Sequence, residues 1–183
     1  MTTALLLVDL QNDYFRGGAL ELVGSDAAVG QAARLLAAWR AAGRPVVHVR
    51  HLSLRPGATF FLPGTPGAEI HPGVHPEAGE PVVEKHFPNS FRDTELQQTL
   101  QGRGVEALVI CGAMSHMCID ATTRAAFDLG YRCSVAADAC ATRDLEFAGR
   151  RVAAADVHAA FMAALAAPYA RVAGAAELLE GLA

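Results

Sequence analysis

The chain has 183 residues and a formal net charge of −4; 52% of its residues are hydrophobic and 19% are charged. This composition excludes a disordered or coiled-coil protein, and we expect residues 1–183 to form one domain with a full core. The absence of a basic cluster argues against a nucleic-acid partner, and no apolar run approaches the roughly 18 residues needed to span a membrane.

Apolar runs alternate with amphipathic segments along the chain, a pattern typical of βαβ units around a parallel sheet. The expected strands, nearly all apolar as in a sheet covered on both faces, are Ala4–Val8, Pro45–Val49, Pro81–Glu84, Ala107–Cys111, Arg132–Ala137 and Ala170–Ala173. The expected helices are Asp26–Ala42, Thr94–Gln101, Cys118–Leu129, Phe147–Ala166 and Ala175–Leu182. Ser25 and Asp93 are expected to cap the first two helices. We therefore predict an α/β fold, a three-layer α/β/α sandwich with a central, mostly parallel, Rossmann-like sheet of about six strands.

The segment Ser53–Gly79 differs from the rest of the chain, because Pro and Gly recur in it and no period of 2 or 3.6 is visible. A loop of this length in a compact domain is usually functional or part of an interface. It joins the second and third strands, so it should lie near the carboxyl ends of the strands, where ligands bind in open α/β sheets. Its apolar residues Phe60, Phe61, Leu62 and Ile70 would be poorly hydrated if exposed. We expect them either to close a pocket as a lid or to form an interface in a homo-oligomer.

The cysteines indicate a reduced protein. The four of them form no CxxC pair, and the N-terminus enters a strand without the basic region of a signal peptide. We therefore expect a cytoplasmic location. Cys111, Cys133 and Cys140 lie in or beside expected strands and are interpreted as buried apolar residues.

Chemically active residues follow three of the expected strands. The first strand ends at Asp9 and the third at Lys85, the only lysine in the chain. The fourth leads through Gly112 and a short turn to Cys118, at the start of an expected helix. The N–H groups and partial positive charge of a helix N-terminus can lower the pKa of a thiol and hold an oxyanion. These three strand ends predict one composite active site.

Three motifs occur along the chain, and together they cover nearly all of it. They are Val8–Phe15 followed by Gly17–Leu20, then Lys85–Phe91 with Thr94 and Leu96, and last Gly112–Ile119 with Thr122. In this order and spacing they resemble the isochorismatase-like cysteine hydrolases, the superfamily that includes nicotinamidases, N-carbamoylsarcosine amidases and isochorismatases.

The resemblance implies a catalytic role for each of the three residues. Cys118 would be the nucleophile, Asp9 the general base, and Lys85 the cation that stabilises developing charge. It also implies an oxyanion hole formed by the backbone N–H groups of Met114 and Cys118, and a cis peptide bond between Ala113 and Met114.

Five further residues match substrate-binding positions of the superfamily. Phe15, Leu20 and Met117 would line the pocket, with plain core packing as the alternative. Gln11 and His116 flank catalytic positions and would either contact substrate or brace the site.

The histidines do not match the metal site of the superfamily. Nicotinamidases bind a divalent metal through an Asp-x-His pair after the second strand and a further histidine. The corresponding stretch 47–51 has no aspartate, and on a strand His48 and His51 face opposite sides. His71 and His75, in the long loop, could in principle chelate. We expect hydrogen-bonded or solvated histidines, no metal and no other cofactor, which argues against nicotinamidase activity.

The predicted function is cleavage of a C–N bond in a small amide, ureido or lactam substrate through a thioester on Cys118. Two alternatives stay open: vinyl-ether hydrolysis, as in isochorismatases, and a catalytically idle member that serves as an oligomerising or binding module. Isochorismatases manage without the cysteine nucleophile, so the motif around Cys118 favours the amidase reaction. We expect specificity to reside in the Ser53–Gly79 loop and in a neighbouring subunit of a dimer or tetramer.

Overall fold

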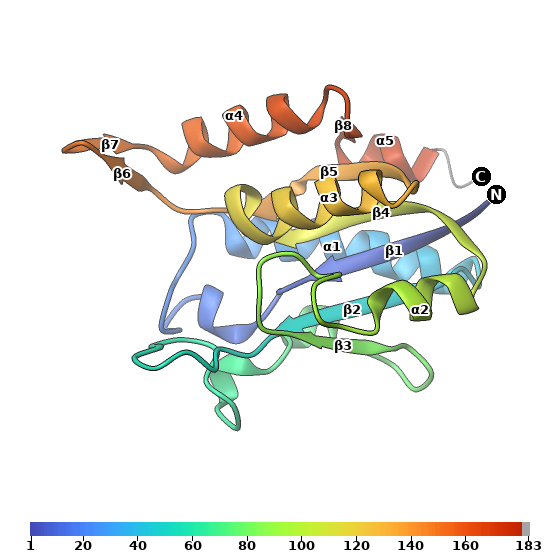
Figure 1. Cartoon of the computed structure of the whole chain (residues 1–183), viewed down its shortest axis with the longest axis horizontal. Helices are drawn as coiled ribbons and strands as arrows, with labels where there is room; N and C mark the ends of the chain where they lie inside the picture. The colour runs from blue at the N-terminus through green and yellow to red at the C-terminus, as the bar shows by residue number, and fades with distance from the viewer. Residues whose placement is uncertain (181–183) are drawn as a thin grey trace.

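The computed structural model describes residues 1–180 of the chain, and a parallel sheet lies at its centre (Figure 1). The sheet has six strands in the order β3-β2-β1-β4-β5-β8, and every neighbouring pair is parallel. The strands are β1 (Thr2–Val8), β2 (Val46–His51), β3 (Val82–Lys85), β4 (Val105–Ala113), β5 (Arg132–Ala141) and β8 (Ala170–Ala173). The predicted strands and the predicted fold class are confirmed.

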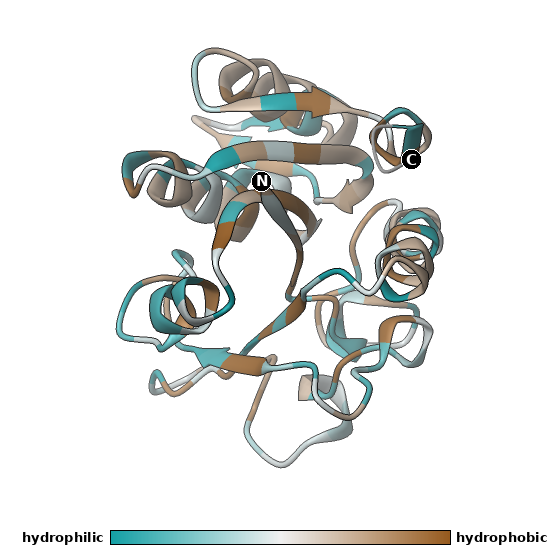
Figure 2. Cartoon of the chain, turned by 90° about the vertical axis from the view of Figure 1, so that its right-hand side faces the viewer, coloured by the Kyte–Doolittle hydropathy of each residue, from teal (hydrophilic) through white to brown (hydrophobic). Residues whose placement is uncertain are grey.

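Helices cover both faces of the sheet (Figure 2). They are α1 (Ser25–Ala41), α2 (Leu96–Gly102), α3 (Asp120–Asp128), α4 (Ala154–Leu165) and α5 (Ala175–Glu180). In β1, Leu5 and Leu7 pack in a cluster with α1 and α5, whereas Leu6 and Val8 pack in a second cluster with α2, α3 and α4. This alternation between two covered faces explains why the strand is entirely apolar. The predicted helix Ala175–Leu182 is present as far as Glu180, and residues 181 and 182 lie outside the described part of the chain.

None of the helices within residues 1–180 is long and apolar enough to cross a bilayer.

Two predicted helix caps are wrong. Ser25 is the first residue of α1, and its Oγ donates to the carbonyl of Leu22 (3.4 Å) in place of capping the helix. The N–H of Leu96, which begins α2, donates to Oγ1 of Thr94 (3.3 Å) and not to Asp93.

The segment before α4 is a hairpin, where the sequence predicts the start of a helix Phe147–Ala166. Its antiparallel strands, which project beyond the end of α4 in Figure 1, are β6 (Leu145–Phe147) and β7 (Arg150–Val152). The two residues between them, Ala148 and Gly149, have φ of 50° and 73°. Two consecutive positive φ angles are typical of a type I′ turn, which favours a two-residue hairpin. The helix therefore begins only at Ala154.

The long loop between β2 and β3 packs on its own chain. Phe61 is fully buried; its ring centroid lies 4.5 Å from that of Tyr14, and its N–H donates to Oδ2 of Asp13 (2.6 Å). Phe60 and Ile70 are partly buried against the same apolar cluster. These contacts favour the lid alternative for most of the loop's apolar residues.

Assembly into a homo-oligomer stays a prediction. Several large apolar side chains remain exposed, among them Leu54 (61%) and Leu62 (37%) of the long loop and Phe147 (81%) on the projecting hairpin. Burying such groups against a second copy would be favourable. Light scattering at micromolar concentration is expected to give a mass above that of a single 183-residue chain. A strictly monomeric mass would contradict the prediction.

A partly buried ion-pair network joins α1, β2 and the end of the long loop. Glu80 accepts hydrogen bonds from Nε and Nη2 of Arg40 (2.7 and 2.8 Å) and contacts Nε2 of His48 at 2.9 Å. Burial raises the pKa of Glu80, but the bonds from Arg40, from the backbone N–H of Glu77 and from His48 outweigh it and lower this pKa to about 2. His48 thus contacts Glu80, whereas His51 contacts Lys85.

Replacing Glu80 with glutamine is expected to lower the free energy of unfolding at pH 7 by about 1–3 kcal/mol. The folded pKa is lower than the unfolded one, so the stabilisation is complete above pH 4.5 and is lost as pH falls toward 2. Urea unfolding of wild type and variant at several pH values should show the two stabilities converging in acid. Glu77→Gln is the matched control, because the Glu77 side chain is 68% exposed. A difference independent of pH would contradict the ion-pair account.

Candidate active site

The carboxyl ends of four neighbouring strands meet at one edge of the sheet. Lys85 ends β3, His51 ends β2, Asp9 follows β1, and Cys118 follows β4. The chain runs from β1 outward to β3 and then returns to β4 on the other side of β1. Connections therefore leave in opposite directions between β1 and β4, and such a switch point is where open α/β sheets bind ligands. The structure thus brings together the three residues predicted to be catalytic.

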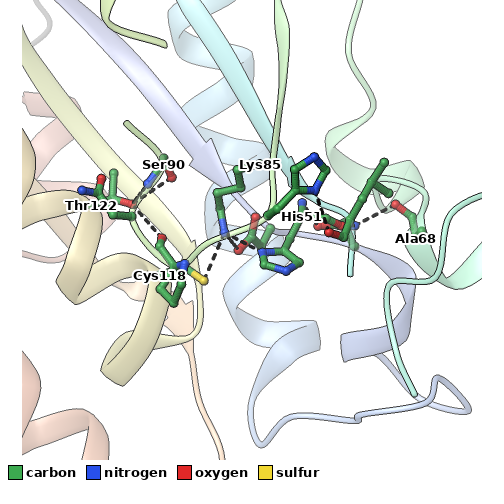
Figure 3. Close-up of polar contacts among 12 residues, drawn as sticks. His51, Ala68, Lys85, Ser90, Cys118 and Thr122 are labelled. Carbon is green, nitrogen blue, oxygen red and sulfur yellow. Dashed lines mark hydrogen bonds and ion pairs between the residues drawn. The ribbon is translucent and has the colours of Figure 1, made fainter. Parts of the chain in front are cut away.

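The ammonium of Lys85 lies at the centre of the site (Figure 3). Its Nζ is 2.7 Å from Oδ2 of Asp9, 3.2 Å from Sγ of Cys118 and 3.2 Å from Nδ1 of His51. Lys85 and Asp9 are fully buried. Burial opposes the charge on the lysine, but Asp9 and Cys118 outweigh it and raise the pKa of Lys85. The lysine therefore stays charged and uses all three of its protons.

Only one of the two carboxylate oxygens of Asp9 is hydrogen-bonded. The residue has φ of 53°, a left-handed conformation that aspartate tolerates, and its N–H donates to the carbonyl of Val49 (2.9 Å). Oδ2 is bound by Lys85, whereas Oδ1 is buried and has no hydrogen-bond partner. An unpaired buried carboxylate oxygen beside a thiol is well placed to accept a proton.

Gly112 allows β4 to approach β1 just before the site. It pairs in register with Val8, and a Cβ at this position would lie 1.9 Å from the Val8 carbonyl oxygen. Its φ of 127° is also a conformation that favours glycine. Only glycine therefore lets the turn that carries Cys118 lie directly beside Asp9.

Cys118, the predicted nucleophile, lies in a short π-helical turn, η4 (Ser115–Ile119), which continues into α3. The helix predicted from Cys118 thus begins three residues earlier, at Ser115. The peptide bond Ala113–Met114 is cis. The carbonyl oxygen of Met114 accepts a hydrogen bond from the N–H of Ile119 (3.2 Å) and not from the N–H of Cys118.

The pKa of the Cys118 thiol differs from what the sequence predicts. Burial raises the pKa of Cys118, the Asp9 carboxylate raises it further, and the charge of Lys85 opposes both without overcoming them. The expected lowering of this pKa by the helix N-terminus is therefore wrong, because the sulfur is desolvated. The resting thiol is protonated at neutral pH and needs a base. The other cysteines are buried as predicted, and burial also raises the pKa of each: Cys111, Cys133 and Cys140.

Gln11 braces the site. Its Nε2 donates to the carbonyls of His51 (2.9 Å) and Ala68 (2.8 Å), and its Oε1 accepts from the N–H of His51 (2.7 Å). The side chain is fully buried and engaged at both ends. Of the two roles considered from sequence, these bonds support bracing over substrate contact.

The other residues matched to substrate positions lie in different surroundings. Phe15 is buried and Leu20 is packed against the same apolar cluster. Met117 is 38% exposed, and Nδ1 of His116 lies 2.6 Å from Oγ1 of Thr142. Contact of these four residues with substrate stays a prediction.

The sequence did not predict the part that two of its features play in the site. His51 was considered only as a possible metal ligand, yet it belongs to the central cluster; the signal was its position at the end of the second parallel strand, beside the strand that ends in Asp9. Thr122 of α3 accepts from the N–H of Ser90 (3.1 Å), and the two hydroxyl groups lie 2.8 Å apart (Figure 3). This contact ties the helix that follows Cys118 to the segment that follows Lys85.

The residues of the site do not fit a divalent metal. Within the described residues, one group of metal-ligating side chains has its ligand atoms close together, within 4.8 Å: Asp9, His51 and Cys118. The Lys85 ammonium is hydrogen-bonded to all three. A divalent cation among the same atoms would be repelled by this buried charge.

We therefore expect hydrolysis to be insensitive to chelators. Prolonged dialysis against EDTA and 1,10-phenanthroline should leave the rate within about twofold of the untreated protein, because Lys85 supplies the positive charge. Metal content and activity should be measured on the same samples. A stoichiometric zinc or iron ion lost together with activity would contradict this expectation.

Known proteins are similar to this chain in sequence and in fold. The sequence model of the Isochorismatase domain matches residues 3–177. An uncharacterised isochorismatase family protein of Bacillus subtilis is 52% identical, covering 94% of this chain and 96% of its own. The crystal structure of a candidate isochorismatase hydrolase from Oleispira antarctica has a TM-score of 0.95 and 60% identity, covering 98% of this chain and 97% of that one. The nicotinamidase of Escherichia coli is 32% identical, covering 75% of this chain and 82% of its own.

Proposed function

This chain belongs to the isochorismatase family and is a hydrolase of the amidase type, and from that premise we propose that it cleaves the C–N bond of a small amide, ureido or lactam substrate through a thioester on Cys118. The observation that carries the proposal is the contact of Lys85 Nζ with both Asp9 (2.7 Å) and Cys118 (3.2 Å) in a buried site. A thiol, a carboxylate and a fixed cation are the groups that acyl transfer requires.

In the first half-reaction, Asp9 acts as the base. Its unpaired Oδ1 accepts the thiol proton of Cys118, and the thiolate attacks the substrate carbonyl carbon. Lys85 stabilises the thiolate, while the backbone N–H groups of Met114 and Cys118 bind the oxyanion. The C–N bond then breaks, the leaving amine takes the proton from Asp9, and a thioester remains.

In the second half-reaction, water replaces the amine. Asp9 takes a proton from the water molecule while the water oxygen attacks the thioester carbonyl carbon. The C–S bond breaks, the proton returns to the sulfur of Cys118, and a carboxylic acid leaves. Because the pKa of Cys118 is raised, the departing sulfur readily recovers its proton.

A panel of small amides, ureides and lactams tests the proposal by release of ammonia or amine. Acid quenching during turnover, followed by peptide mass spectrometry, should find the acyl group on Cys118. Release of amine without an acylated Cys118 would contradict the thioester. Absence of amine release across the panel, with an alkylatable Cys118, would favour the idle or vinyl-ether alternatives.

A further inference from the structure

His51 has a defined tautomer. Lys85 is an ammonium and has no lone pair, so in the 3.2 Å contact it donates and Nδ1 of His51 accepts. The proton of the neutral imidazole must then lie on Nε2. Burial and the charge of Lys85 lower the pKa of His51 to about 4, so the ring is neutral at pH 7.

The Nε2–H of His51 is a donor without a partner in the described part of the chain. The residue is 9% exposed, and Nε2 is not among the unpaired polar atoms that are sealed from solvent. Nε2 is therefore accessible to solvent, and to a small molecule that approaches it from there.

The position of this donor is fixed by its surroundings. The amide of Gln11 bonds to both the N–H and the carbonyl of His51, Lys85 holds Nδ1, and the ring lies 6.0 Å from that of Phe61. A donor held in place on three sides costs little entropy when it binds a ligand. No step of the acyl-transfer mechanism uses it.

We propose that His51 is a specificity-determining residue whose Nε2–H donates a hydrogen bond to a neutral acceptor on the substrate, a ring nitrogen or a second carbonyl oxygen close to the scissile carbonyl. The inference deepens the proposed function and rests on it, because it assumes that the substrate carbonyl is attacked by Cys118. Proximity limits where the acceptor can lie, since one nitrogen of His51 is within 4.8 Å of the ligand atoms of Asp9 and Cys118. A neutral acceptor suits a neutral donor, and the charges of Asp9 and Lys85 already balance each other.

The test uses aldehydes that add reversibly to the thiol. Cys118 sulfur bonds to the aldehyde carbon, the thiol proton passes to the carbonyl oxygen, and nothing leaves. Benzaldehyde is compared with the 2-, 3- and 4-pyridinecarboxaldehydes, which replace one ring C–H with an acceptor nitrogen. Dissociation constants come from protection of Cys118 against iodoacetamide, followed by peptide mass spectrometry. Each aldehyde is compared between proteins, so its intrinsic reactivity cancels.

Two variants separate the donor from the contact with Lys85. His51→Asn keeps an acceptor near the position of Nδ1 and loses the donor at Nε2, whereas His51→Gln places an amide N–H near Nε2. For at least one pyridine isomer, His51→Asn should weaken binding about 10-fold while benzaldehyde changes less than twofold, which is the loss of one neutral hydrogen bond. His51→Gln should restore most of that loss.

Equal weakening of all four aldehydes by His51→Asn would overturn the proposal and leave His51 as a positioning residue for Lys85. No weakening of any of them would overturn it as well. If none of the four protects Cys118 in the wild type while iodoacetamide still reacts there, the assumption of carbonyl attack by Cys118 fails, and the role of His51 falls with it. That failure is visible without any variant.

Discussion

Replacing Cys118 with alanine is expected to lower kcat/KM for amide hydrolysis by at least about 10⁴-fold. The variant keeps Asp9 and Lys85 but has no atom that can form the acyl intermediate, and water held near the same carbonyl is a much poorer nucleophile. The fold should persist, because the change removes one sulfur atom from the π-helical turn η4, which is held by backbone hydrogen bonds. Ammonia release and thermal unfolding of the same preparation provide the two measurements.

Cys133→Ala is the matched control for that experiment. Cys133 is buried in the same apolar cluster as Cys118, and burial raises its pKa too, but it lies at the opposite end of its strand from the site. Its loss should cost about 1 kcal/mol of stability and little activity. Turnover by Cys118→Ala above a tenth of the wild-type rate would refute the nucleophile assignment.

Replacing Lys85 with methionine is expected to damage both stability and catalysis. The Asp9 carboxylate would remain buried without its cation, which typically costs about 3–5 kcal/mol of unfolding free energy. Among the described residues, Lys85 is the only cationic group that is hydrogen-bonded to Cys118. Without it the thiolate and the oxyanion would lose their stabilising positive charge, so we expect a fall in kcat of about 10²–10³-fold or more. Urea unfolding followed by circular dichroism measures the first effect, and the hydrolysis assay the second.

The double variant Asp9→Asn, Lys85→Met isolates the ion pair. Removing both charges eliminates the uncompensated carboxylate, so the double variant should be more stable than Lys85→Met alone while staying inactive. If Lys85→Met unfolds within about 0.5 kcal/mol of wild type, or if the double variant is the less stable of the two, the buried pair does not stabilise the site as described.

The strands and the polar residues at their ends were predictable from local sequence. Each central strand is covered on both faces, so it appears as an unbroken apolar run such as Leu5–Val8, and its end is marked where a polar residue interrupts the run. In a parallel sheet these ends converge at one edge, which is why Asp9, Lys85 and Cys118 could be grouped without coordinates. The hairpin before α4 was missed because Ala148 is an unusual residue at positive φ, and its turn signal rests on Gly149 alone.

The sequence by itself determined the layers, the polar strand ends that meet at one edge of the sheet, and two of the three side chains grouped with Cys118, namely Asp9 and Lys85. Only the tertiary structure decided their protonation and their partners. The pKa of Cys118 rises because neighbouring elements exclude water from the sulfur, an effect that local sequence does not encode. Gln11 is a brace because the loop carbonyl of Ala68 lies within reach, and the tautomer of His51 follows from an ammonium that arrives from the adjacent strand. Burial and hydrogen bonding depend on residues far apart in the chain, so chemistry at this edge is specified by packing, whereas the identity of the reacting groups is specified by sequence.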